Sequence, residues 1–147
     1  MAPVCVDASL VLLWLLREDL SDKADALLRA WRGGGVQLIG PPLLVMEVAS
    51  GLRQAVHRVR IGEDEADALL QDFLGMDIDV REPAGLLERA WQMGKLTRSP
   101  RLYDMFYVAL AESQACVLWT ADERLVNFVG ARSSVRWVGD VQLEEPE

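Results

Sequence analysis

A short strand pattern that leads directly into an apolar helix pattern opens the chain. Residues 3–16 have the sequence PVCVDASLVLLWLL. The run Pro3–Val6 is typical of a buried strand, and Ser9–Leu16 is typical of a helix. A strand followed by a helix is the repeating unit of parallel sheets that are covered on both faces.

The same alternation continues along the rest of the chain. Further strands are predicted at Val36–Ile39, Asp77–Val80, Cys116–Trp119 and Val135–Val138. Helices are predicted at Asp22–Trp31, with Ser21 as its N-cap, and at Pro42–Arg60, Glu63–Leu74, Pro83–Leu96, Leu102–Ser113 and Asp122–Phe128. The order predicts an α/β fold, a three-layer α/β/α sandwich with a mostly parallel central sheet.

The length of the chain fits one domain. The chain has 147 residues, and a domain typically has about 100–200. No stretch has the composition of a linker, so we expect residues 1–139 to form a single domain. Residues 140–147 contain four acidic residues and no basic one, which predicts a solvated acidic tail.

Composition excludes several classes of function. The 15 Lys and Arg against 23 Asp and Glu give a net charge of −8, which argues against non-specific nucleic-acid binding but not against a nucleic-acid enzyme that recruits metal ions. One histidine and two cysteines exclude a multi-histidine zinc site. The longest apolar run, Leu10–Leu16, is far shorter than the ~20 residues of a membrane span. The N-terminus lacks the basic start of a signal peptide, and we therefore expect a cytoplasmic protein.

Four carboxylates lie where apolar residues surround them. Asp7 directly follows the first strand, and Asp122 follows the Cys116–Trp119 strand by a few residues. In open α/β sheets, ligands bind at the carboxyl ends of the strands. Glu47 and Asp104 each interrupt an apolar helix pattern, where an ionised carboxylate costs free energy unless a partner offsets it.

Separate structural roles are possible for three of these acids. Asp7 and Asp122 could each cap a helix, and Asp104 could pair with Arg101 at i−3. A single cluster around a hard cation explains all four acids together, because Mg²⁺ and Mn²⁺ prefer oxygen ligands and tolerate water in the remaining positions. The sequence therefore predicts a metal site built from Asp7, Glu47, Asp104 and Asp122.

The motifs around these acids resemble those of PIN-domain ribonucleases, and within that family the VapC toxins of toxin–antitoxin pairs. They are VCVDAS at residues 4–9, PPLLVMEV at 41–48, LYDMFYVALAE at 102–112 and LWTADERL at 118–125. Each motif alone is weak, but their order along residues 4–125 makes the match specific.

The resemblance implies a metal-dependent ribonuclease in which Asp7, Asp104 and Asp122 ligate Mg²⁺ or Mn²⁺. Glu47 would bind a second metal ion, or position or deprotonate the attacking water. The hydroxyls of Ser9 and Thr120 would orient carboxylates or water, although an N-cap and a strand-end turn are structural alternatives for them. The resemblance also implies a small antitoxin partner and a homodimer, and Asn127 is the only candidate for further polar support in the acidic pocket.

Basic residues could bind the RNA substrate. Arg53, His57 and Arg60 are spaced to share a helix face, and Arg58 and Arg101 add charge nearby. The same residues, Arg53, Arg58, Arg60 and Arg101, could instead bind an acidic partner or form a solvated surface. His57 is a further candidate for general acid or base.

Two other functions compete with the nuclease. A non-catalytic PIN-like binding module would keep the fold but have lost an acid, and all four acids are present. A receiver-like phosphoacceptor domain also binds Mg²⁺ beside strand ends, but it needs a lysine after its last strand, and the two lysines are Lys23 and Lys95.

Overall fold

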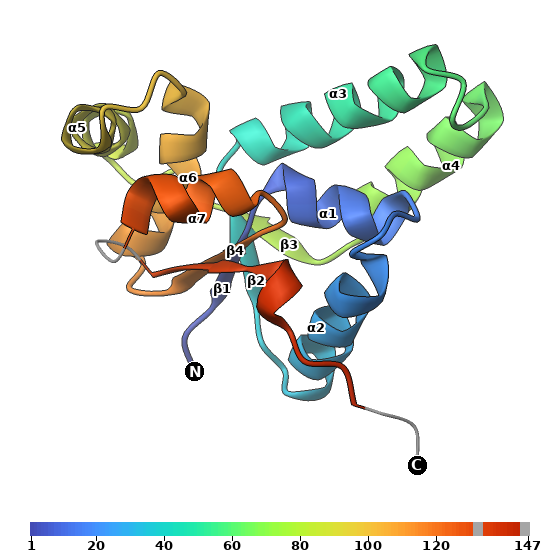
Figure 1. The fold of residues 1–147 in the computed structure, drawn as a ribbon, viewed down its shortest axis with the longest axis horizontal. Coiled ribbons are helices and arrows are strands. Elements are labelled where there is room, and N and C mark those ends of the chain that lie inside the picture. Colours follow the sequence, from blue (N-terminus) through green and yellow to red (C-terminus); the bar gives the residue numbers. More distant parts are fainter. Residues whose placement is uncertain (131–133, 145–147) are drawn as a thin grey trace.

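Five short parallel strands form the centre of the structure, a computed structural model that describes residues 1–130 and 134–144 (Figure 1). They are β1 (Val4–Val6), β2 (Leu38–Gly40), β3 (Ile78–Val80), β4 (Val117–Thr120) and β5 (Val135–Trp137), in the spatial order β3-β2-β1-β4-β5. Every described strand pair is parallel, so the prediction of a mostly parallel sheet is confirmed. Residues 145–147 of the expected tail lie outside the described residues.

Helices cover both faces of this sheet. They are α1 (Ala8–Leu15), α2 (Ser21–Gly33), α3 (Leu43–His57), α4 (Glu63–Leu74), α5 (Leu86–Thr97), α6 (Leu102–Ser113) and α7 (Glu123–Val129), with a short 3-10 helix η2 (Val138–Asp140). The chain steps from β1 to β2 and β3 in one direction, and from β3 over to β4 and β5 in the other. Since such crossovers are right-handed, α1–α4 lie on one face and α5–α7 on the other (Figure 1), which confirms the three-layer sandwich.

The core is formed where helices α1, α3 and α6 pack on and around the central strands. Leu10, Val48 and Leu118 are fully buried, and so is most of α6 from Met105 to Ala111. Gly51 marks a close approach of α3 to α1, because a Cβ added there would lie 2.5 Å from a methyl group of Leu12. This packing fixes the first turns of α1 and α6, on which the site depends.

Three local predictions are wrong. Ser21 is not the N-cap of α2 but its first residue, and its buried hydroxyl donates to the Leu13 carbonyl at 2.7 Å. Helix α3 ends at His57 rather than Arg60, because Val59 adopts a left-handed φ of 58°, so Arg53 and Arg60 do not share a helix face. Helix α5 begins at Leu86 instead of Pro83, after a turn in which Gly85 has a φ of 81°.

No helix within residues 1–130 and 134–144 is long and apolar enough to cross a membrane.

The strand order changes direction at β1. Strand β2 lies on one side of β1 and β4 on the other, so the connections after β1 and β4 leave toward opposite faces of the sheet. A crevice forms outside the carboxyl ends of two such strands, and this is where open α/β proteins bind ligands. The backbone N–H of Asp7 donates to the carbonyl of Trp119 at 3.4 Å, so the ends of the two strands are held side by side.

Candidate active site

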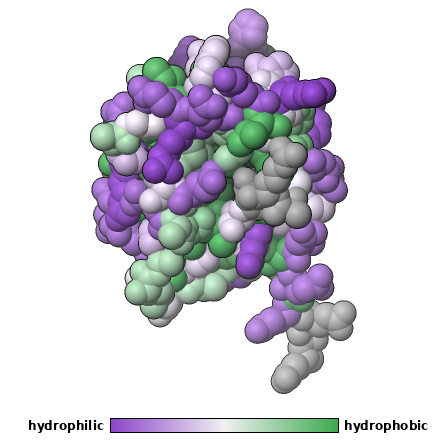
Figure 2. Space-filling view, turned by 90° about the vertical axis from the view of Figure 1, so that its left-hand side faces the viewer, coloured by the Kyte–Doolittle hydropathy of each residue, from purple (hydrophilic) through white to green (hydrophobic). Residues whose placement is uncertain are grey.

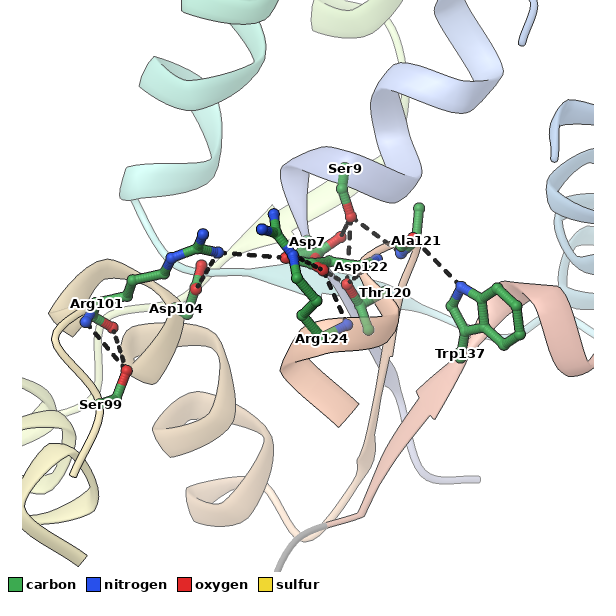
Figure 3. Close-up of polar contacts among 10 residues, drawn as sticks. All are labelled: Asp7, Ser9, Ser99, Arg101, Asp104, Thr120, Ala121, Asp122, Arg124 and Trp137. Atoms are coloured by element: carbon green, nitrogen blue, oxygen red, sulfur yellow. Dashed lines mark hydrogen bonds and ion pairs between the residues drawn. The ribbon is translucent and has the colours of Figure 1, made fainter. Parts of the chain in front are cut away.

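Asp7 lies at the bottom of this crevice and is almost fully buried, with 7% of its surface exposed. It is the N-cap of α1, since its Oδ1 accepts the backbone N–H of Leu10 at 3.0 Å. The same oxygen accepts the Ser9 hydroxyl at 2.7 Å, and Oδ2 accepts the Thr120 hydroxyl at 2.5 Å. The predicted cap is therefore present, and the buried carboxylate is at the same time held by hydroxyls from two elements (Figure 3).

Ser9 and Thr120 tie the start of α1 to the end of β4. Ser9 Oγ accepts the backbone N–H of Ala121 at 2.9 Å, and Thr120 Oγ1 accepts the backbone N–H of Asp122 at 2.9 Å. Both hydroxyls are used as donors to Asp7 and as acceptors from the loop that carries Asp122. The hydroxyls of Ser9 and Thr120 therefore hold Asp7 and the loop that carries Asp122 at a fixed spacing.

Burial raises the pKa of Asp7 from 3.8 to about 6, although the bonds from Thr120, Ser9 and the Leu10 N–H lower it and nearby Asp104 raises it again. The pKa values of Asp104 and Glu47 are also raised, in each case chiefly by burial. Carboxyls with raised pKa values that influence one another mark this region as a candidate functional site.

Folding stability of the metal-free protein should therefore fall as pH rises from about 4 to above 6. In this window the folded state holds the Asp7 proton more tightly than the unfolded state, so deprotonation disfavours folding. The change in pKa from 3.8 to about 6 corresponds to on the order of 3 kcal/mol. Urea denaturation in EDTA at about pH 4.5 and pH 7.5 measures the effect, and Asp7→Asn should show a smaller difference between the two pH values than the wild type. If the free energy of unfolding changed equally with pH in both proteins, the raised pKa of Asp7 would be contradicted.

Asp104 and Asp122 face each other across the side chain of Arg101 (Figure 3). Arg101 Nη1 lies 3.7 Å from Asp104 Oδ2 and 3.5 Å from Asp122 Oδ2. Asp122 is also the N-cap of α7, because its Oδ1 accepts the backbone N–H of Arg124 at 3.0 Å. The predicted pairing of Asp104 with Arg101 is thus present, but the guanidinium bridges two acids of the site and does not form an isolated surface pair.

Glu47 approaches the site from α3 and is held by a residue that sequence reasoning missed. The hydroxyl of Tyr107, on α6, donates to Glu47 Oε1 at 2.5 Å. Tyr107 has only 2% of its surface exposed, and burial together with Glu47 raises its pKa well above the ordinary value. One signal was available in the sequence, because Tyr107 is one turn after Asp104 and carries a hydroxyl into an otherwise apolar helix face.

The basic residues predicted for RNA or partner binding fall into two groups. Arg53 and Arg60 already have acidic partners, Glu63 at 2.6 Å and Glu18 at 2.8 Å. Arg58 is exposed just after α3, and Arg101 lies in the site itself. His57 and Asn127 are exposed, and within residues 1–130 and 134–144 no hydrogen bond or ion pair joins either of them to the four acids.

The donor set suits a hard divalent cation. All candidate ligands are carboxylate oxygens, and the guanidinium between Asp104 and Asp122 marks a position where the site stabilises positive charge. Within the described residues, no three Asp, Glu, His or Cys side chains lie close enough to coordinate one ion directly. Mg²⁺ usually keeps several of its waters and takes only one or two protein carboxylates, so this spacing is compatible with such an ion.

The relatives found by sequence comparison are named as VapC ribonucleases. The chain is 37% identical over 122 residues to the VapC ribonuclease Mb0985 of Mycobacterium bovis, a match that covers 83% of this chain and 87% of that protein. It is 39% identical over 100 residues to ribonuclease VapC1 of Mycobacterium tuberculosis, covering 67% of this chain and 72% of that protein.

Solved structures share the fold. The crystal structure of Mycobacterium tuberculosis VapC20, described as a sarcin-ricin loop cleaving toxin, superposes with a TM-score of 0.62 at 18% identity and covers 84% of this chain and 93% of its own. The structure of FitAB bound to a DNA fragment gives a TM-score of 0.67 at 14% identity over 98% of this chain and 99% of its own. The family model described as PIN domain matches residues 4–130. This chain therefore belongs to the PIN domain family.

Proposed function

We propose that this protein is a divalent-metal-dependent ribonuclease and the toxin of a VapBC-type toxin–antitoxin pair. The observation that carries the proposal is a chain of contacts among three acids: Thr120 joins Asp7 to Asp122 at the ends of β1 and β4, and Arg101 joins Asp122 to Asp104 on α6. Relatives of 37–39% identity are named VapC ribonucleases, which supports the same chemistry here. The receiver-like alternative is wrong, because the chain matches the PIN domain model over residues 4–130.

The four acids divide between two tasks in the proposed mechanism. Asp7, Asp104 and Asp122 would hold Mg²⁺ or Mn²⁺, which when bound activates water and stabilises charge on the phosphate. Ser9 and Thr120 keep both oxygens of Asp7 in a fixed orientation. Glu47 accepts a proton from the attacking water, and Tyr107 holds the carboxylate in place for this step.

A groove beside the acids is a candidate path for RNA or for the antitoxin. It has a volume of about 810 Å³, begins at Ser9 and Ala121, and is lined by three arginines and two acids, namely Arg17, Arg58, Arg60, Glu18 and Asp19. Arg17 is paired with Asp22 and Asp25. Arg60 is held by Glu18, whereas Arg58 is exposed and forms no salt bridge within the described part of the chain. An acidic segment of an antitoxin placed here would cover the entrance to the acids and so prevent cleavage.

A homodimer would cover apolar side chains at the other edge of the site. Met46 on α3 and Tyr103 on α6 are 69% and 65% exposed, which is a cost in water that a second copy could remove. We also propose that the protein acts in the cytoplasm, since its proposed substrate is RNA.

The proposal is tested by cleavage of a single-stranded RNA with and without metal. Purified protein should cleave RNA in millimolar Mg²⁺ or Mn²⁺ and stop in EDTA, because the acids alone repel phosphate. The same ions should raise the melting temperature, since they relieve repulsion among Asp7, Asp104 and Asp122 and bind only the folded state. Equal cleavage in EDTA, or a melting temperature that neither ion changes, would contradict a metal site.

A further inference from the structure

A small hollow adjoins the acids on the side of α7. It has a volume of about 260 Å³ and is lined by Pro100, Arg101, Asp104, Arg124, Leu125 and Phe128. Pockets for drug-sized ligands have about 300–1,000 Å³, so this space suits one flat ring system rather than a whole nucleotide. Asp104 belongs both to this hollow and to the acid site, which makes the two continuous.

The wall of the hollow includes the aromatic ring of Phe128, which is not buried in the core. Leu125 and Val129 turn one face of α7 into the core, at 5% and 2% exposure, whereas Phe128 beside them is 46% exposed. Figure 2 looks onto the side of the molecule that carries α5, α6 and α7, where apolar groups lie among hydrophilic side chains. A single exposed Phe is common on protein surfaces, so exposure alone assigns nothing to Phe128.

Two arginines distinguish this ring from an ordinary exposed residue. Arg101 Nη1 and Arg124 Nε each lie 3.5 Å from an Asp122 oxygen, and both line the hollow. A strand of RNA whose phosphate reaches the acids would therefore meet positive charge at the rim of an apolar, aromatic-lined hollow. This is the arrangement that single-strand binding sites use, in which arginines track the backbone and aromatic rings stack on the bases.

We propose that this hollow binds the base next to the phosphate that is cleaved, and that Phe128 stacks on that base. This inference rests on the nuclease function proposed above. The hydroxyl of Ser99, which also lines the hollow, already accepts the backbone N–H of Arg101 at 3.0 Å. The remaining wall offers chiefly stacking and charge. Recognition therefore depends on ring area, and a purine binds better here than a pyrimidine.

The test combines a protein variant with a missing base. Phe128→Ala should lower kcat/KM for a short single-stranded RNA by roughly 5- to 150-fold, the range of one base stacked on an aromatic ring, at about 1–3 kcal/mol. An RNA with an abasic nucleotide at one position beside the scissile bond should lose a similar factor with wild-type protein. On that RNA, Phe128→Ala should cause little further loss, because the partner of the ring is already absent. Phe128→Tyr should restore activity, and Trp91→Ala, which removes another exposed aromatic that does not line the hollow, should not change it.

Other outcomes overturn the inference. Unchanged kcat/KM in Phe128→Ala, or full additivity of the two losses, would show that no base stacks there, while the nuclease function would stand. A variant that cleaves normally but copurifies less with its protein partner would assign the hollow to that partner instead. Fluorescence anisotropy with a labelled, non-cleavable oligonucleotide separates base binding in the hollow from the nuclease function. Phe128→Ala should weaken binding of the oligonucleotide even if the wild type proves to have no nuclease activity.

Discussion

Asp7→Asn and Asp104→Asn proteins are expected to lose RNA cleavage almost completely. Each substitution keeps the shape of the side chain but removes the charge that a hard cation requires. Loss of one group that stabilises charge in a transition state commonly costs about 10²–10³ in rate, and loss of the metal should cost more. Single-turnover cleavage of one RNA by wild type and both variants measures the effect.

The stability of the same variants separates a catalytic role from a structural one. Asn is a good N-cap, and the Thr120 hydroxyl can rotate to accept from the new amide at position 7. Since burial raises the pKa of Asp7 to about 6, Asp7→Asn should leave the metal-free protein as stable as the wild type or more stable. Asp72→Asn, an exposed acid on α4, is the matched control and should change neither property. Wild-type cleavage rates in both site variants would contradict the nuclease mechanism.

Tyr107→Phe is expected to reduce kcat by about 10- to 100-fold with little change in KM. The variant loses the hydrogen bond at 2.5 Å that holds Glu47, and a hydrogen bond to a charged group is worth about 1.5–3 kcal/mol. That bond lowers the pKa of Glu47 against the effect of burial, so its removal should raise the pKa further. The acidic limb of the pH–rate profile should therefore move to higher pH, which a purely structural role would not produce.

The chain offers a close control for this variant. Tyr103 lies one turn earlier on α6 and is 65% exposed, so Tyr103→Phe removes a hydroxyl from the same helix without removing the bond to Glu47. It should keep both kcat and the pH–rate profile. An unshifted profile in Tyr107→Phe would show that Tyr107 does not position Glu47 for catalysis.

The sequence predicted the parts of the site that depend on local pattern. Asp7 follows a short apolar strand, and the rule that strand ends gather at one edge of a parallel sheet placed it beside the acid after β4. The proximity of Asp7 and Asp122 could therefore be predicted before any contact was known, whereas the metal-binding role of the four acids stays a prediction. The strands and most of the helices were predicted for the same reason, since their periodicity and end signals lie within a few residues of each other.

The contacts that sequence reasoning missed join residues far apart in the chain. Tyr107 donates a hydrogen bond to Glu47, 60 residues away, because the fold brings these positions of α3 and α6 together. Arg101 reaches Asp122, 21 residues away, rather than only its neighbour Asp104. The early end of α3 depends on the left-handed conformation of Val59. No glycine or proline at this position signals such a conformation in the sequence. Tertiary packing decides each of these features, and no local pattern encodes it.

Binding of Mn²⁺ and cleavage of RNA, titrated on the same protein samples, test the central claim most directly. Electron paramagnetic resonance reports free Mn²⁺, and the wild type should bind the ion over the concentration range in which cleavage rises. Asp104→Asn should lose both properties together, while Asp72→Asn keeps both. Cleavage that proceeds without bound Mn²⁺ or Mg²⁺, or an Asp104→Asn protein that still binds Mn²⁺ and cleaves as the wild type does, would contradict the account.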